Sequence, residues 1–140
     1  MKSKPAARKR TPSRVWVFFP KRQTMPPEYK NKINQRTEKL VARLKNDYVK
    51  RKPPKRWNYA ADVYGKWRGN TFYLCAKYNC PGPNALSPSF ESKFARLEYF
   101  GNNSFRLYAM RHNGEWLVIE GGAPLERCFQ ALETNTWFRP

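Results

Sequence analysis

The chain has 140 residues, of which 28 are Lys or Arg and 10 are Asp or Glu, so its formal net charge is +18. Aromatic residues make up 16% of it, which excludes a wholly disordered chain, and no apolar run approaches the ~18 residues that a membrane-spanning helix needs. The length favours one domain. Because so large a charge opposes folding by self-repulsion, we expect a polyanionic partner, above all nucleic acid.

The basic residues are concentrated near the N-terminus. Residues 1–56 hold 19 Lys and Arg against three acids, whereas residues 57–140 hold nine against seven. This asymmetry predicts a basic flexible arm, residues 1–24, ahead of a single α+β domain, residues 25–140. Residues 1–14 cannot bury enough apolar surface to fold alone. The segment Val15 to Phe19 is apolar and β-prone, so we expect it to dock on the folded body or on a protein partner.

The first element expected in the domain is a basic helix. Pro26 and Pro27 after Thr24 predict its start, and it should run to about Tyr48. Its apolar stripe recurs at three- and four-residue steps: Ile33, Thr37, Leu40, Val41, Leu44 and Tyr48. Cations occupy its other faces. Pro53 and Pro54 end any continuation and make residues 50–56 a stiff basic linker.

From Trp57 the hydrophobic period changes to two, which indicates strands. A hairpin is expected over 59–67 and 71–78, turning at Arg68-Gly69-Asn70, and is followed by a loop over 80–89. Three further strands are expected over 94–100, 105–111 and 115–120. The prediction is an antiparallel meander of about five strands, broken at Gly121-Gly122.

A short C-terminal helix is expected to cap this sheet. Pro124 should start it, and its apolar face comprises Leu125, Cys128, Phe129 and Leu132. Trp137 and Phe138 are expected to fold back onto the body, because two large rings in water would be an exposed apolar liability. The whole fold is therefore predicted to be α+β, with a helix packed on the meander.

The meander interleaves aromatic and basic residues. Alternation places Tyr73 with Lys77 on one strand face and Arg106 with Tyr108 on another, and Arg96 could lie beside them. Rings stack on bases and cations neutralise phosphate, so these residues predict a platform for single-stranded nucleic acid. The opposite face is the predicted core: Phe72, Leu74, Leu107 and Trp116. The alternative is that Tyr73 and Tyr108 pack under the N-terminal helix.

Metal and catalytic chemistry have little support in the sequence. Cys75, Cys80, Cys128 and His112 lack the paired spacing of a zinc site, so Cys75 and Cys128 are expected to be buried. His112 is expected to be exposed at an Asn-Gly turn, and no phosphate-cradling glycine loop occurs. We therefore expect no catalytic residue, metal or cofactor. Three cysteines, an odd number, favour a reducing compartment, hence the cytoplasm, or the nucleus of a eukaryotic or viral host.

The sequence thus predicts a non-enzymatic nucleic-acid-binding protein, with RNA in a ribonucleoprotein such as the ribosome favoured over DNA. The alternatives are a small nuclease or toxin, a DNA-binding protein and a protein-interaction adaptor. No membrane role is expected, because packing explains the helix's apolar stripe. The residues expected to contact nucleic acid are Lys2, Lys4, Arg8, Lys9, Arg10, Arg14, Lys21, Arg22, Lys32, Arg36, Lys39, Arg43, Lys50, Arg51, Lys52, Lys55, Arg56, Tyr73, Arg106 and Tyr108.

From Leu40 to Pro140 the chain resembles a small bacterial family known only as a domain of unknown function. The resemblance rests on the order of these features: Arg51-Lys52-Pro53-Pro54, Arg68-Gly69-Asn70 and Leu74, Arg96, Leu107-Tyr108, and Trp116. It implies a helix packed on a curved antiparallel sheet and supplies no activity. The basic arm before Thr24 lies outside it.

Overall fold

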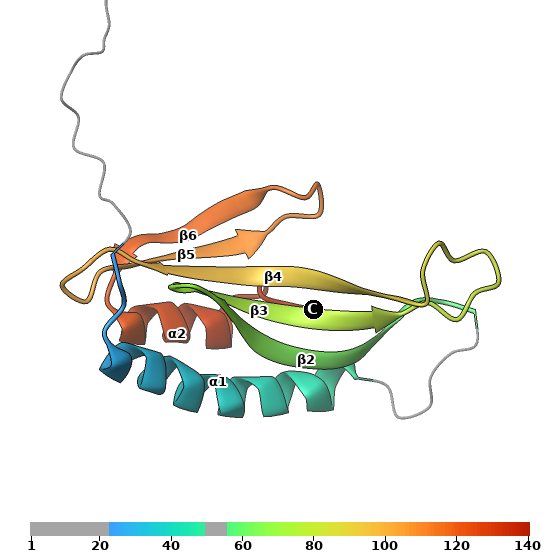
Figure 1. Cartoon of the computed structure of the whole chain (residues 1–140), viewed down its shortest axis with the longest axis horizontal. Helices are drawn as coiled ribbons and strands as arrows, with labels where there is room; N and C mark the ends of the chain where they lie inside the picture. Colours follow the sequence, from blue (N-terminus) through green and yellow to red (C-terminus); the bar gives the residue numbers. More distant parts are fainter. Residues whose placement is uncertain (1–22, 50–55) are drawn as a thin grey trace, which may run out of the picture.

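Two helices lie on the same side of an antiparallel sheet in the computed structural model, which describes residues 23–49 and 56–140 (Figure 1). The elements are α1 (Pro27–Tyr48), β2 (Tyr59–Arg68), β3 (Thr71–Asn79), β4 (Ser89–Tyr99), β5 (Phe105–Met110), β6 (Trp116–Ala123) and α2 (Leu125–Thr134). The five strands pair in chain order, β2-β3-β4-β5-β6, as a meander. The α+β fold expected from the sequence is therefore confirmed.

Part of the basic region lies outside the described residues. This part comprises residues 1–22, with the segment Val15 to Phe19, and the linker residues 50–55. The cations predicted there to contact nucleic acid are Lys2, Lys4, Arg8, Lys9, Arg10, Arg14, Lys21, Arg22, Lys50, Arg51, Lys52 and Lys55.

Helix α1 begins and ends where the sequence predicts. Pro26 occupies the cap position and Pro27 the first turn, where the missing N–H of proline costs no hydrogen bond. Thr24 is exposed, and no side chain caps the helix. Ile33, Leu40 and Leu44 are buried against the sheet, so the apolar stripe is confirmed. Within the described residues, neither α1 nor α2 is long and apolar enough to cross a membrane.

The core fills the space between the helices and one face of the sheet. Phe105 is fully buried and packs against the rings of Tyr29 and Tyr99, whose centroids lie 5.4 and 5.1 Å away. The apolar face of α2 is buried as predicted, at Leu125, Cys128, Phe129 and Leu132. The expectation that both rings near the C-terminus fold back is confirmed only for Phe138, which is buried, whereas Trp137 is 47% exposed.

Two strand boundaries differ from the sequence prediction. Strand β4 begins at Ser89 rather than Phe94, because β3 continues to Asn79 and Phe90 stacks on Tyr78 with ring centroids 5.2 Å apart. Strand β6 does not break at the two glycines but continues to Ala123, which pairs with Phe105. Sheet pairing supplies the hydrogen bonds in both places, and it outweighs the local preference of proline and glycine for turns.

Candidate functional site

Rings and cations form a row across the sheet, on the face that the helices leave uncovered. The row follows direct strand pairing: Lys66 with Tyr73, Tyr73 with Arg96, and Arg96 with Tyr108. Because neighbouring strands lie about 4.8 Å apart, these four residues span roughly 15 Å. Together with Trp116, they are called the open face below. Phe72 and Leu74 point to the helices instead, so the alternative that Tyr73 and Tyr108 pack under α1 is wrong.

Trp116 belongs to the open face and not to the predicted core. Its ring lies 6.2 Å from Tyr73 and 6.3 Å from Tyr108, between centroids. Trp116 pairs with Met110, which shares a strand face with Tyr108. The pairing of β5 with β6 contains register shifts between Phe105 and Tyr108. These shifts do not affect Trp116, because the pairs Tyr108 with Val118 and Met110 with Trp116 follow in regular register. Trp116 therefore lies on the same face as Tyr108.

Arg96 is held at the centre of the open face. Its guanidinium carbon lies 3.9 Å from the ring centroid of Tyr108 and 5.0 Å from that of Trp116. Behind it, the Tyr108 hydroxyl donates a 2.7 Å hydrogen bond to Oε1 of Glu98, and Nε of Arg96 lies 3.7 Å from Oε2 of the same carboxylate. Glu98 is only 7% exposed. The buried carboxylate therefore holds both the ring and the cation that stacks on it.

This packing leaves some of the rings accessible and covers others. Tyr108 is only 8% exposed, because Arg96 lies over its ring. Tyr73 and Trp116 are half-buried. The sequence identified Tyr108 as a surface on which a base could stack, but the structure makes it a support for Arg96. The sequence interpretation singled out Tyr73 but missed Trp116. The face of Trp116 follows from its pairing with Met110 of β5.

Lysines flank Tyr73 on the open side of the sheet. Nζ of Lys93 lies 5.6 Å from the Tyr73 ring centroid. Lys66 and Lys93 both contact Oε1 of Glu91, at 3.1 and 3.4 Å, and the Tyr64 hydroxyl donates a hydrogen bond to this carboxylate. The hydrogen bonds from Tyr64 and then Lys66 hold the pKa of Glu91 at about 2. Two lysines thus share one carboxylate, and the surroundings of Tyr73 stay positive.

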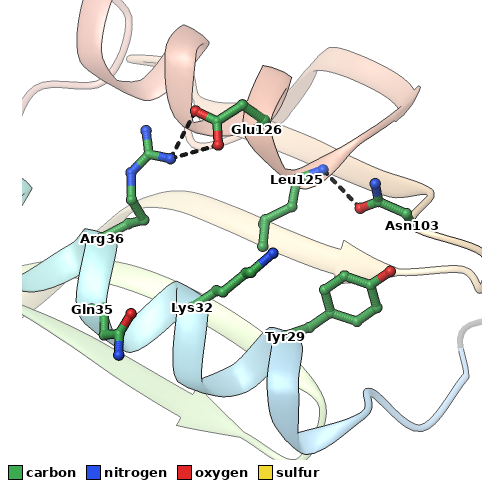
Figure 2. A pocket seen from close by; sticks show the side chains of 7 residues that line it. All are labelled: Tyr29, Lys32, Gln35, Arg36, Asn103, Leu125 and Glu126. Atoms are coloured by element: carbon green, nitrogen blue, oxygen red, sulfur yellow. Dashed lines mark hydrogen bonds and ion pairs between the residues drawn. The ribbon is translucent and has the colours of Figure 1, made fainter.

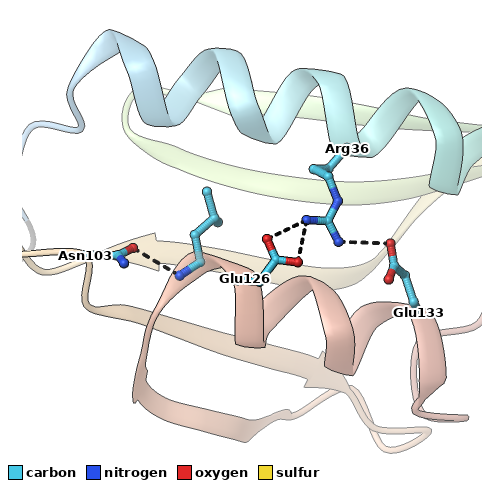
Figure 3. A network of polar contacts seen from close by, with 5 residues as sticks. Arg36, Asn103, Glu126 and Glu133 are labelled. Atoms are coloured by element: carbon cyan, nitrogen blue, oxygen red, sulfur yellow. Dashed lines mark hydrogen bonds and ion pairs between the residues drawn. The ribbon is translucent and has the colours of Figure 1, made fainter.

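The cations of α1 divide into exposed and paired groups. Lys32, Lys39 and Arg43 are exposed, as is Arg56 ahead of β2. Arg36 instead joins the two helices: its Nη1 donates to both carboxylate oxygens of Glu126 at 2.8 Å, and its Nη2 donates to Glu133 at 3.2 Å (Figure 3). Arg36 was predicted to contact phosphate, but its guanidinium is already occupied by two carboxylates of α2.

A cavity of about 380 Å³ lies beside this ion pair, between α1 and the start of α2 (Figure 2). Lys32 is its basic wall, but Glu126 lines it as well. The first backbone N–H of α2, that of Leu125, donates to Oδ1 of Asn103. Three polar groups of the cavity are therefore already engaged: Arg36 and Glu126 join the two helices, and Asn103 binds the start of α2. The open face is the stronger candidate for a binding site.

Cys75, Cys128 and His112 take the positions that the sequence predicts. Cys75 and Cys128 are fully buried, and burial raises their pKa values to about 11 and about 12, so both thiols are protonated at neutral pH. His112 is exposed at its turn. Among residues 23–49 and 56–140, no group of three or more His, Cys, Asp or Glu side chains is arranged to hold a metal ion.

One family model matches this chain. It is that of DUF3024, a domain of unknown function, and it covers residues 27–140, so the chain belongs to this family. The match takes in the whole of α1 and therefore begins earlier than the resemblance seen from Leu40 onward. Comparison with the curated proteins and with the solved structures finds no match. The function is therefore argued from the open face itself.

Proposed function

We propose that this DUF3024 protein binds single-stranded nucleic acid without altering it chemically, and that it prefers RNA to DNA. The observation that carries the proposal is the cross-strand row Lys66, Tyr73, Arg96 and Tyr108, with Trp116 against it. Aromatic rings and guanidinium planes stack on bases of any sequence, and cations beside them neutralise the phosphates between those bases. An uncovered sheet face with helices behind it presents such groups in a fixed plane.

The proposal gives different tasks to the side chains of the open face. Tyr73, Trp116 and the outer side of Arg96 offer flat surfaces for bases, because they are only partly buried. Lys66, Lys93 and Arg106 flank them and outnumber the nearby carboxylates Glu91 and Glu98, so they can attract phosphate. RNA is favoured as the ligand because its loops and ends present the unpaired bases that such surfaces bind.

The basic part of the chain adds an electrostatic contribution that does not depend on base sequence. Lys32, Lys39 and Arg43 on α1, and the cations of residues 1–22, would contact phosphates and release counterions. This contribution weakens as salt rises, whereas stacking on rings persists. The two contributions can therefore be separated by the salt concentration of the measurement.

The test is a binding assay with labelled single-stranded RNA, read by fluorescence anisotropy at low and high salt. Each base stacked on a ring contributes roughly 1 to 3 kcal/mol, so Tyr73→Ala and Trp116→Ala should each weaken binding about 5- to 150-fold at high salt. Trp137→Ala is the matched control, because this tryptophan is 47% exposed and follows α2 near the C-terminus. Circular dichroism must show that each variant is folded.

Full-strength binding at high salt by both variants would remove the open face from the proposal. Single-stranded DNA of the same sequence, measured in parallel, tests the preference for RNA. Intact RNA after incubation is expected, because the protein is proposed to be a binding module. Cleavage of the RNA would instead favour the alternative of a nuclease or toxin.

A further inference from the structure

Helix α1 runs beside β2, at one edge of the sheet, and is tied to it at two points (Figure 1). Near the end of α1, Lys45 forms a 3.1 Å ion pair with Asp62. Near its start, Asn34 accepts a 3.0 Å hydrogen bond from the indole of Trp67. The two points lie about 17 Å apart along the helix and also about 17 Å apart along the strand, given the rise per residue of each. The helix and the edge strand therefore run antiparallel, with matched lengths between the two contacts.

A cavity of about 440 Å³ extends between these two contacts, and both of them line it. Its apolar lining comes from α1, β2 and β3, at Val41, Val63 and Phe72. Thr37 lines it as well, and within the described residues its buried Oγ1 has no hydrogen-bond partner. The volume is that of a site for a small ligand or a few side chains.

The backbone of β2 is open on the side away from β3, because β2 pairs with no other strand in the described parts of the chain. The two strands are joined by the two-residue turn Gly69-Asn70, and from there back to Asp62 their pairing has no register shift. In such a hairpin every second residue directs its N–H and C=O outward, here Val63, Gly65 and Trp67. The N–H of Val63 accordingly donates to Oδ1 of Asp62 at 2.9 Å. Gly65 is exposed and has no side chain to screen its backbone.

Gly65 also shapes the cavity. A Cβ at this position would lie 2.5 Å from the ring of Phe72 and 3.2 Å from the methyl carbon of Thr37. Because glycine has no Cβ, the Phe72 ring can lie against the strand and form the apolar floor of the groove. The groove thus combines an accessible row of backbone groups with an apolar cavity beside it.

The end of this groove near Trp67 is positively charged. Nζ of Lys30 lies 5.5 Å from the Trp67 ring centroid, and Arg68 is the next residue of β2. Among residues 23–49 and 56–140, neither Lys30 nor Arg68 forms an ion pair with a carboxylate. Glu38 lines the cavity farther along α1, so an acidic group is favoured only at the end near Trp67.

We infer that the groove between α1 and β2 binds an extended peptide of a partner protein, which adds to the edge of β2 as a further strand. The outward N–H and C=O groups of β2 pair with the peptide backbone, and one apolar peptide side chain enters the cavity over Phe72. An acidic residue of the peptide pairs with Lys30 or Arg68 at the end of the groove.

The groove suits a peptide better than the other possible occupants. A nucleic acid has no row of backbone N–H donors for the carbonyl groups of β2. A second copy of this chain, with its own net charge of +18, would be repelled. The inference does not rest on nucleic-acid binding, because the rings of the open face lie on the other side of the sheet.

The test uses the full chain and a labelled peptide of alternating valine and glutamate, about six residues long to match the groove. By fluorescence anisotropy, this probe should bind about tenfold or more tightly than a peptide of the same composition in which valines and glutamates are segregated. Methylation of alternate backbone nitrogens of the probe should abolish binding in one of the two patterns and spare it in the other, because only one set faces β2. In the complex, the amide hydrogen of Gly65 should exchange about tenfold more slowly, whereas that of Lys66, which faces β3, should be unchanged.

A charge reversal tests the end of the groove near Trp67. Lys30→Glu should weaken binding of the alternating peptide about tenfold, because the acidic residue loses its partner. Arg139→Glu is the matched control, since it makes the same change at an exposed cation near the C-terminus, and it should leave peptide binding unchanged. Circular dichroism must show that both variants are folded.

Equal binding of the alternating and segregated peptides would overturn the inference, as would an unchanged exchange rate at Gly65. Protection of Gly65 that rises with protein concentration in the absence of peptide would instead assign the edge to a second copy. Displacement of the peptide by single-stranded RNA would assign it to the open face. Peptide binding is otherwise measured without RNA, so failure here is distinguishable from failure of the proposed function.

Discussion

The two faces of the sheet are built from alternate residues of the same strands, yet they differ in almost every physical respect. Toward the helices, Phe105, Leu107 and Leu74 are excluded from water and contact other apolar side chains. Toward the open side, Tyr73 and Arg96 are partly accessible and make cation–ring and ion-pair contacts. A period of two lets each strand contribute to stability on one face and to binding on the other. The difference suggests that substitutions on the two faces will have separable effects.

The largest effect on stability is expected from the helix-facing side. Phe105→Ala should lower the free energy of unfolding by about 3 to 5 kcal/mol, because it leaves a cavity beneath Tyr29 and Tyr99. Val118→Ala, on the open side of β6, should change it by about 0.5 kcal/mol or less. Urea denaturation measures both. Similar losses for the two variants would contradict the division between a core face and an accessible face.

A smaller effect is expected where the open face itself buries a charge. Glu98→Gln should cost about 1 to 3 kcal/mol, because Arg96 loses its carboxylate and the Tyr108 hydroxyl a charged acceptor. The control is Glu115→Gln, since Glu115 is exposed in a turn. The unfolding free energies of both variants, measured in urea, give the comparison. If Glu98→Gln is no less stable than the control, the buried carboxylate does not hold the open face together.

The smallest effect concerns Glu91, and it is expected to depend on pH. The pKa of this carboxyl is lowered to about 2 from an ordinary value of 4.5, so the ionised form is favoured in the folded protein. Its contribution is therefore fully present above about pH 4.5 and is lost as pH falls toward 2. Glu91→Gln should be less stable than the wild type by about 1 kcal/mol or less at pH 7. Unfolding measured between pH 7 and pH 2.5 should show the difference shrinking, and a constant difference would argue against the ionised carboxylate as its source.

Local patterns were sufficient for most of the fold. The three- and four-residue spacing of Ile33, Leu40 and Leu44 predicted both the helix and its buried face, and the end at Tyr48 was also correct. Alternation in β3 correctly separated Tyr73 from Phe72 and Leu74. Such features are decided within one helix or strand, where residues near in sequence are also near in space. The strand ends at Ser89 and Ala123 were missed, because they depend on which strand lies alongside.

The amino-acid sequence by itself determined the charge asymmetry, the α+β order of elements and the face on which Tyr73 lies. Tertiary structure decided which of these groups can meet a ligand. Arg36 is occupied by Glu126, which lies 90 residues away in sequence, and Tyr108 is covered by Arg96 from the neighbouring strand. The pairing of Trp116 with Met110 of β5 places Trp116 on the open face and not in the expected core. Long-range pairing and register arise from contacts between distant segments, and the periodicity within one segment does not indicate which segment it will pair with.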